Sequence, residues 1–510
     1  MTGGQSARPV VLAWLLLAVV SGSLLLRAAL TPPPGTVFVG TFYYVDDFYN
    51  YLSYVQQAED GAIVFRNKLA SPTLPPALFN VEWLAVGWLS VLLGGSPLLA
   101  YRLLGLFALV LFVVVVDRWL VRGGLPPSRR LAGLLLVFTG GGLGGVLMIL
   151  GWLPGSRAYD VLAGLFPFVQ TMANPHFVVG TTLLAAGLGA FAAGRPGWGV
   201  LIGTVLGLVR PYDAALLAGV EGLAVLVRWP AQEWPRRLLP VAALVPVLAY
   251  NAWVFLWSPG FGIFSSPRYT TSGPSLVELA IAIGPAALAA LTTLRIRDDG
   301  NGAARLHRLY LTLWAALAVL MVVVRPVSFS LQFLSGVGVP LLTLGAIGLG
   351  QMRRGVLAGA VPVFAATALV VTWLQSTPNT YRNVPADRFG VAAALRTVCQ
   401  PGELVLAPPD IGLYVGGLSA CWPFVSHTAS PEHASRDDAT RRFYFSSADA
   451  RARFLDEACV AHVVVPRGWT HGGLPPEAPY RQTLDVDGPG GGLAVYSRTT
   501  DSASCRPSSP

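Results

Sequence analysis

Charged residues are scarce in this sequence. They make up 12% of the 510 residues, against roughly 25% in an ordinary soluble domain, and Lys68 is the only lysine. Hydrophobic residues reach 54%, and the mean hydropathy is +0.58. This composition excludes a soluble globular domain as the main part of the chain and predicts a polytopic, mainly α-helical membrane protein.

Long apolar runs end near Leu374. Before this point, runs of roughly 17 to 22 residues recur, and each is long enough to cross a bilayer as a helix. Residues 78–93 and 161–171 can be counted as crossings or not, so we expect about 11 to 13 spans. Residues 1–374 are therefore predicted to form a transmembrane helical bundle, with a first extracytoplasmic loop at about residues 31–77.

The remaining residues, 375–510, have the pattern of a soluble α/β domain. Segments 404–407 and 463–465 are predicted strands, and segment 448–458 is a predicted helix. The polar residues between them, including His427 and His433, are typical of a soluble surface. None carries a recognisable catalytic pattern, although such a domain could help to bind an acceptor.

The distribution of charge predicts the topology. The tail holds 12 Arg and 13 Asp or Glu, so the membrane part carries the net charge of +9. Its arginine clusters mark cytoplasmic loops, which excludes a nucleic-acid footprint as their explanation. They place the N-terminus inside and both the first loop and the tail outside. The apolar run 10–26 fits a first span better than a cleaved signal peptide, because many spans follow it.

Cysteines are absent from the membrane part. All four, Cys399, Cys421, Cys459 and Cys505, lie in the tail that we place outside, where disulfides persist. Cys399 with Cys459 is a plausible pair, but four cysteines allow three connectivities. None of them has the spacing of zinc ligands.

Two adjacent acids, Asp46 and Asp47, stand out in the aromatic stretch FYYVDDFYNY. If residues 43–58 are helical, neighbouring side chains diverge by about 100°, so the two acids have different roles or one of them is the helix N-cap. Capping leaves the second acid unexplained, because a carboxylate near lipid is costly unless it is hydrated, paired or functional. The functional interpretation is a general base or metal ligand, with aromatic side chains such as Tyr51 beside a sugar.

These residues resemble the GT-C superfamily of polytopic glycosyltransferases, which includes protein mannosyltransferases and bacterial aminoarabinose transferases. The similarity lies in a first helix, an outer loop with an acid pair, the Pro-rich segment 75–79 and the segment 94–102 (GGSPLLAYR). It reappears in segment 325–349, where an Arg precedes a Pro-Leu helix.

The resemblance implies a polyprenyl-phosphate sugar donor and a catalytic Asp in the first outer loop. We favour Asp47 as the base, with Asp46 supporting it or binding a divalent cation such as Mg, Mn or Ca; the two roles could be reversed. Cations at the outer boundary would bind the donor phosphate. The candidates are Arg210, Arg325, His176 and Arg268, although Arg210 could instead pair with Asp213 and Arg325 could extend from a helix end to the interface.

We therefore expect a multi-pass glycosyltransferase of the bacterial plasma membrane. It would transfer a sugar, with inversion, to a hydroxyl of a glycan, lipid or protein acceptor. The alternative from another class is a transporter or lipid-handling protein, for which intramembrane charges should line a path and internal repeats might occur. No convincing repeat is present, and the acids cluster on the predicted outer side, which favours the enzyme.

Overall fold

The computed structural model describes residues 7–70, 74–162, 164–265, 273–296, 301–353, 355–377, 379–428, 430, 432–467, 479–489 and 491–499. The chain divides into two compact units. The helical unit comprises residues 1–26, 101–257 and 264–377, and the mixed unit comprises residues 27–100, 258–263 and 378–510. Residues 31–77, the predicted first outer loop, thus belong to the same unit as the tail.

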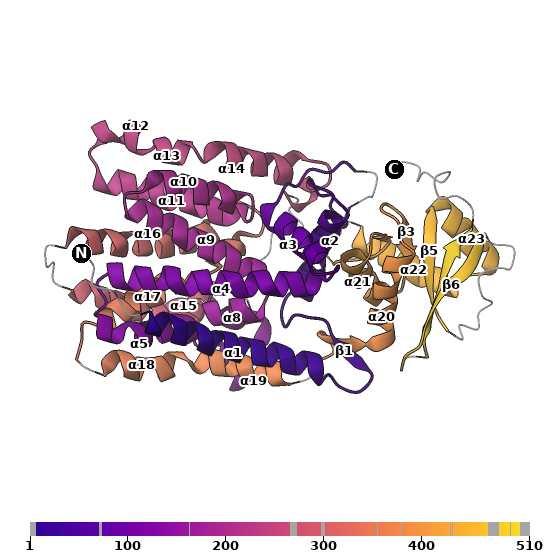
Figure 1. Cartoon of the computed structure of the whole chain (residues 1–510), viewed down its shortest axis with the longest axis horizontal. Helices are drawn as coiled ribbons and strands as arrows, with labels where there is room; N and C mark the ends of the chain where they lie inside the picture. Colours follow the sequence, from indigo (N-terminus) through magenta and orange to yellow (C-terminus); the bar gives the residue numbers. More distant parts are fainter. Residues whose placement is uncertain are drawn as a thin grey trace. The chain divides into compact units, whose positions relative to one another are not determined.

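Long apolar helices form the helical unit, where they lie side by side and roughly parallel (Figure 1). Among the described residues, seven segments are long and apolar enough to cross a membrane, or eight if the bent pair Ala231–Ala242 and Val245–Trp257 is one span. The seven are Arg8–Leu30, Pro97–Arg122, Pro175–Ala192, Leu276–Arg295, Gly302–Val324, Ser330–Leu349 and Val356–Gln375. The multi-pass architecture predicted from composition is confirmed.

The helices that lie wholly or mainly in this unit are the long ones of these spans and several shorter ones. They are α1 (Arg8–Leu30), α4 (Pro97–Arg122), α5 (Arg130–Thr139), α6 (Gly144–Ile149), α7 (Tyr159–Leu162), α8 (Pro167–Met172), α9 (Pro175–Ala192), α10 (Pro196–Gly207), α11 (Pro211–Arg228), α12 (Trp234–Arg237), α13 (Leu239–Ala242), α14 (Val245–Ala252), α15 (Leu276–Leu291), α16 (Gly302–Val324), α17 (Gly338–Leu349), α18 (Val356–Phe364) and α19 (Ala366–Ser376).

Among the described residues, fewer segments are long enough to cross a membrane than the 11 to 13 expected, because apolar sequence also forms short helices. Residues 78–93 yield only α3 (Val81–Leu92), whose 12 residues extend about 18 Å, less than a hydrocarbon core of about 30 Å. Residues 161–171 are divided between the ends of α7 and α8, where Gly164 takes a positive φ of 62° and Pro167 begins a new helix. Hydropathy alone does not reveal these breaks.

The mixed unit contains the predicted α/β tail. Its five-stranded sheet has the order β4-β3-β5-β7-β6, with β4, β3 and β5 parallel and β7 antiparallel to both β5 and β6. The strands are β3 (Leu404–Leu406), β4 (Trp422–Pro423), β5 (Val460–Pro466), β6 (Tyr480–Val486) and β7 (Leu493–Arg498). Helices of the tail are α20 (Ala386–Ala394), α21 (Pro409–Leu418), α22 (His433–Phe445) and α23 (Ala448–Glu457). Both predicted strands and the predicted helix are confirmed.

Residues 31–77 contact the tail and α3 through a strand and a helix. Strand β1 (Thr36–Phe38) pairs with β2 (Asn383–Pro385) in antiparallel register, with Thr36 opposite Pro385. Helix α2 (Val45–Glu59) packs against both α3 and α21. Residues near the two ends of the sequence therefore share one folded unit.

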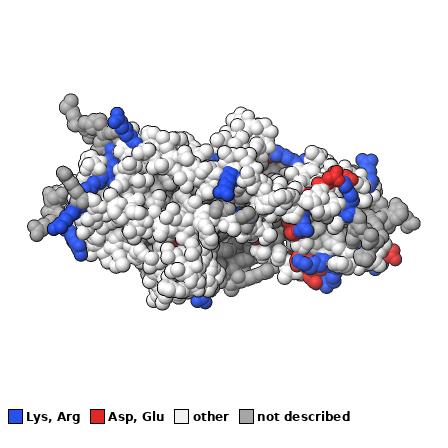
Figure 2. Space-filling model, turned by 90° about the horizontal axis from the view of Figure 1, so that it is seen from below, with Lys and Arg blue, Asp and Glu red and all other residues white. Residues whose placement is uncertain are grey.

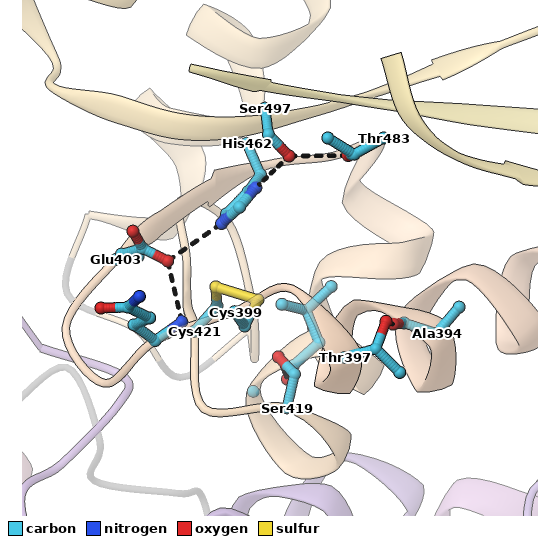
Figure 3. Close-up of a disulfide and its surroundings, with 12 residues drawn as sticks. Ala394, Thr397, Cys399, Glu403, Ser419, Cys421, His462, Thr483 and Ser497 are labelled. Atoms are coloured by element: carbon cyan, nitrogen blue, oxygen red, sulfur yellow. Dashed lines mark hydrogen bonds and ion pairs between the residues drawn. A yellow bond between two sulfur atoms is a disulfide. The ribbon is translucent and has the colours of Figure 1, made fainter. Parts of the chain in front are cut away.

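A disulfide joins Cys399 and Cys421, whose Cα atoms are 5.3 Å apart (Figure 3). The predicted pair Cys399 with Cys459 is therefore wrong. The reason is the sheet order, because Cys399 and Cys421 precede the adjacent parallel strands β3 and β4, whose N-terminal ends lie together. Cys459 is also disulfide-bonded, and Cys505 lies outside the described residues.

This pairing predicts the product of proteolytic digestion without reductant. Mass spectrometry of the protein digested with a glutamate-specific protease, which cuts after Glu403 between the two cysteines, should detect a cross-linked peptide pair that contains Cys399 and Cys421, and reduction should separate it into two. A cross-linked peptide joining Cys399 to Cys459 would contradict the structure.

Candidate functional site

The acid pair occupies the first turn of α2. The residue before the helix is Tyr44, which adopts the left-handed conformation (φ 52°, ψ 51°) and provides no side-chain cap. Asp46 and Asp47 are the second and third helical residues, so the interpretation of either acid as the N-cap is wrong. A left-handed non-glycine residue costs about 1–3 kcal/mol, so the surrounding packing must hold Tyr44 in place.

A residue of the tail takes over the capping role. The backbone N–H of Val45, which has no partner within the helix, donates to the hydroxyl oxygen of Tyr381 at 3.1 Å. Burial, followed by the charge of Asp46, raises the pKa of Tyr381, which keeps this hydroxyl neutral. The start of α2 is thereby tied to the segment that leads into β2.

The buried face of α2 fixes the direction of the acids. Tyr49 packs edge-on against Tyr414 of α21, with ring centroids 4.7 Å apart, and donates a hydrogen bond to the carbonyl of Val39 at 2.8 Å. Gly417 allows this close approach, because a Cβ there would lie 2.7 Å from the backbone oxygen of Tyr49. The first turn of α2 is therefore placed by aromatic packing on the tail.

The tail also supplies a histidine to the acid pair. Nε2 of His427 lies 3.4 Å from Oδ1 of Asp47; the His427 side chain is 12% exposed and that of Asp47 is 39% exposed. The sequence interpretation of His427 as an ordinary surface residue misses this role. No local signal could have found it, because the two residues come from opposite ends of the chain.

The two acids have different electrostatic surroundings. Burial raises the pKa of Asp46, and the charge of Asp47 raises it further, against opposing effects of His427, a hydrogen bond with Thr428 and the charge of His433. Burial lowers the pKa of His427, but the hydrogen bond to Asp47 and the charges of both acids outweigh it and raise the pKa overall. Asp47 is thus the acid that has the imidazole of His427 beside it.

Tyrosines surround the acids as neutral groups. Burial, with a further contribution from the charge of Asp47, raises the pKa values of Tyr44 and Tyr54. Tyr51, which we expected beside a sugar, stacks on Trp83 of α3 with ring centroids 4.9 Å apart and an interplanar angle of 20°. Its predicted contact with substrate stays a prediction.

Among the predicted phosphate-binding residues, Arg210 and His176 gather around Asp213 in the helical unit. Arg210 is buried, with Nε 3.0 Å from Oδ2 of Asp213 and Nη2 donating to Oε1 of Gln332 at 3.1 Å. Local pairing of Arg210 with Asp213, the alternative left open by the sequence, therefore occurs. His176 is also buried, and it is close enough to Asp213 for the two side chains to interact electrostatically. Nη1 of Arg210 is buried with no hydrogen-bond partner among the described residues.

The other two predicted cations differ from this pair. Arg325 ends α16 in the left-handed conformation (φ 55°) and is exposed, and its Nη2 donates to the carbonyl of Gly273 at 3.2 Å. Arg268 lies outside the described residues.

Metal-ligand spacing occurs elsewhere in the described part of the chain. Cys399, Cys421 and His462 are close enough to share an ion, but the two cysteines form the disulfide. Figure 3 shows His462 between Glu403 and Ser497, with its Nε2 3.0 Å from the carboxylate and its Nδ1 2.8 Å from the hydroxyl. Asp46, Asp47 and His427 do not form such a group, and Asp46 as a metal ligand stays a prediction.

Lys68 anchors the first loop close to this site. It is buried, and its Nζ donates to Oε1 of Gln56 in α2 at 3.0 Å and to two carbonyls at the end of α21, those of Gly416 at 3.0 Å and Ser419 at 2.8 Å. The negative end of the α21 dipole favours a cation there. Burial nevertheless lowers the pKa of Lys68 to about 7. The single lysine thus has a structural role that its rarity in the sequence did not reveal.

Comparisons with known proteins were made on sequence and on structure. No known family profile matches the sequence, and no curated protein matches it. A cryo-EM structure of the mycobacterial arabinofuranosyltransferase AftD is similar to this chain, with a TM-score of 0.57 and 15% identity. The similarity covers 98% of this chain and 40% of the AftD chain. A mutant of that enzyme gives a TM-score of 0.52 over 98% of this chain and 42% of its own, also at 15% identity.

An oligosaccharyltransferase from Archaeoglobus fulgidus, crystallised with Zn and sulfate, is similar over 95% of this chain and 73% of its own. Its TM-score is 0.50 and its identity 12%. The chain has the GT-C fold. It spans about two fifths of the length of the AftD chain, and at these identities the GT-C fold is what the comparisons establish.

The buried ammonium of Lys68 predicts how stability depends on pH. Its pKa is about 7 in the folded protein and 10.5 ordinarily, so between these values the unfolded chain binds more protons at this group. Its contribution should therefore make the protein more stable as pH rises from about 7 to about 10. The melting temperature of the purified protein, compared with that of Lys68→Met, should carry this slope in the wild type and lose it in the variant. Equal slopes would contradict the assignment.

Proposed function

We propose that this protein is a membrane glycosyltransferase that moves a sugar from a polyprenyl-phosphate donor to an acceptor hydroxyl on the extracytoplasmic side. The observation that carries the proposal is the pairing of Asp47 with His427 beside Asp46. This arrangement offers a partly exposed carboxylate held by an imidazole, in a chain with the GT-C fold. Carboxylates with a fixed neighbour are well suited to take a proton from a hydroxyl.

The proposed reaction is a single displacement at the anomeric carbon. The acceptor oxygen forms a bond to this carbon while the bond to the donor phosphate breaks, and the leaving group is polyprenyl phosphate. Asp47 accepts the proton of the acceptor hydroxyl, and His427 orients the carboxylate. Asp46, whose pKa is raised, supports Asp47 or binds a cation. Inversion of the anomeric configuration follows from a single displacement.

Negative charge develops on the departing phosphate and needs stabilisation. We assign this role to Arg210 and His176, supported by Arg325 and Arg268. Support for Arg210 comes from its buried Nη1, which has no hydrogen-bond partner among the described residues and can donate to a phosphate oxygen. Where a divalent cation takes part, Asp46 would supply a ligand, and the cation would supply positive charge for the phosphate.

The acid pair provides the first test of this proposal. Transfer from a panel of polyprenyl-phosphate sugars should be measured in membranes that contain equal amounts of the wild type, Asp47→Asn or Asp46→Asn. Loss of the base should lower the rate about 10²- to 10⁴-fold, and we expect this in Asp47→Asn.

The matched control for this test is Asp449→Asn. Asp449 is exposed and is likewise the second residue of a helix, α23, so its substitution makes the same chemical change at a comparable position. Transfer by this variant should equal that of the wild type. Equal transfer by all four proteins would reject the catalytic assignment, and no transfer from any donor would favour the transporter or lipid-handling alternative.

The histidine gives an independent prediction through the pH dependence of the rate. His427 places a charge against Asp46 and so favours the ionised form of this acid. In His427→Gln the acidic limb of the pH–rate profile should move to higher pH, because Asp46 loses this support. His433→Gln should shift it less, since the charge of His433 is the smallest of the effects on Asp46. A uniform loss of rate at every pH would indicate a merely structural role for His427.

A further inference from the structure

A cavity of about 220 Å³ opens among four helices of the helical unit, α4, α9, α10 and α16. Three of its lining residues are arginines, Arg118, Arg122 and Arg195, and a fourth is His307. The other side is apolar and includes Val115, Ile202 and the rings of Trp119 and Trp198. The cavity therefore combines a cationic wall with an apolar one. None of its lining residues belongs to the acid pair or to the groups assigned to sugar transfer.

The arginines gather without acidic partners. Arg118 and Arg195 are close enough to Arg122 for their charges to repel it, and none of the three makes an ion pair within the described ranges of the chain. Collecting like charges is unfavourable unless water or an anion compensates. A phosphate group is the anion that arginine binds best, through paired hydrogen bonds.

His307 presents a second, independent sign of a ligand. Its Nδ1 lies 2.8 Å from the carbonyl of Ala303 and donates to it, and its ring packs edge-on against Trp119 with centroids 5.4 Å apart. The residue is 4% exposed, and its Nε2 is buried with no hydrogen-bond partner in the described structure. A buried polar atom of this kind calls for a partner. In the neutral ring Nε2 accepts a hydrogen bond, so a hydroxyl group of a ligand would satisfy it.

The position of the cavity favours a lipid over a soluble anion. Arg122 ends the apolar span of α4, and Arg195 directly precedes the apolar α10, so both lie at the boundary that the apolar stretches define. Trp198 is 59% exposed in the first turn of α10, as is typical of tryptophan at a membrane interface. Figure 2 shows basic side chains, which are all arginines in the helical unit, gathered toward one end of that unit. Basic pockets between membrane helices commonly hold lipid headgroups.

The floor of the cavity is kept open by small side chains. Ala186, Gly189 and Ala190 of α9 line it, and Trp119 is held beside them by a hydrogen bond from its Nε1 to the carbonyl of Ala185 at 3.0 Å. A Cβ on Gly189 would lie 3.5 Å from the Trp119 ring, so this face fits closely around the indole. The cavity is thus a formed pocket rather than a loose group of surface charges.

We propose that this cavity binds the headgroup of an anionic phospholipid, with Arg118, Arg122 and Arg195 on the phosphate and Nε2 of His307 accepting a hydrogen bond from a headgroup hydroxyl. The apolar wall and Trp198 lie against the lipid chains. The lipid is a structural ligand of the protein and not a substrate of sugar transfer.

The test uses the full-length protein in a neutral detergent and measures lipid binding by native mass spectrometry. Phosphatidylglycerol, which carries both a phosphate and free hydroxyls, is titrated against phosphatidylcholine. The wild type should retain phosphatidylglycerol in preference. Arg118→Gln with Arg122→Gln should weaken it about thirtyfold, the loss expected for two arginines at a lipid surface.

Two further variants separate a formed site from general charge. Arg236→Gln with Arg353→Gln removes two exposed arginines that do not line the cavity and should leave binding unchanged. Ala190→Leu narrows the cavity but keeps every charge, and it should weaken binding as well. Each variant must melt at the wild-type temperature without added lipid, which separates lost binding from misfolding.

Three outcomes would overturn the proposal. Equal retention of phosphatidylcholine would show that negative charge is not recognised. An equal loss in the Arg236 and Arg353 control would show that binding follows overall charge. Tight binding of inorganic phosphate, or its displacement of the lipid at millimolar concentration, would assign the arginines to a soluble anion instead.

Discussion

The packing of α2 against α21 is the interaction on which the candidate site depends. Tyr49 can seat against Tyr414 only because Gly417 leaves its backbone uncovered at that point. This seating places the first turn of α2 next to the chain that carries His427. Without it, Asp47 would be one more carboxylate in an outer loop, with no imidazole beside it. Aromatic packing in the core of the mixed unit thus determines an arrangement of charges at its edge.

Buried polar contacts also hold α2 in place, although burying a charged group is unfavourable. Lys68 joins α2 to the end of α21 through neutral oxygens, and burying its charge is unfavourable enough to lower its pKa substantially. At the same end of α2, Glu59 accepts a hydrogen bond from Arg396, which also donates to the carbonyl of Gly95 at 3.0 Å. These contacts hold the C-terminal end of α2, and the hydroxyl of Tyr381 holds its N-terminal end. Such ties suit a site in which one carboxylate must be presented in a fixed direction.

The helical unit treats charge in two ways. Arg210 and Asp213 are buried together as an ion pair, and Nη2 of Arg210 also donates to the amide oxygen of Gln332. Arg118, Arg122 and Arg195 instead surround an open cavity and share no acid. The buried Arg210–Asp213 pair is typical of an interior polar site. The arginine-lined cavity is typical of a binding site for an anion from the membrane. Charged residues are rare in this chain, so both groups of charged side chains are candidates for binding sites.

Local sequence properties were sufficient for the membrane class, the division between an apolar bundle and an α/β tail, the strands at Leu404 and Val463 and the helix that carries Asp46 and Asp47. Each follows from hydropathy or from a periodicity of two or 3.6 residues, which depends on neighbouring residues. The same reasoning expected more spans than the seven or eight found among the described residues, because breaks such as that at Gly164 interrupt a run without changing its composition. It also favoured the wrong cysteine pair, because strand order cannot be read from spacing.

The sequence by itself determined that this protein crosses the membrane many times and that the acid pair is unusual. Only the tertiary structure decided what lies beside that pair. His427, Tyr381 and Lys68 reach α2 or its surroundings through contacts that join the first loop to the tail, and the arginine cavity combines four helices. Contacts of this kind arise from packing between distant segments, and no local pattern of residues encodes them.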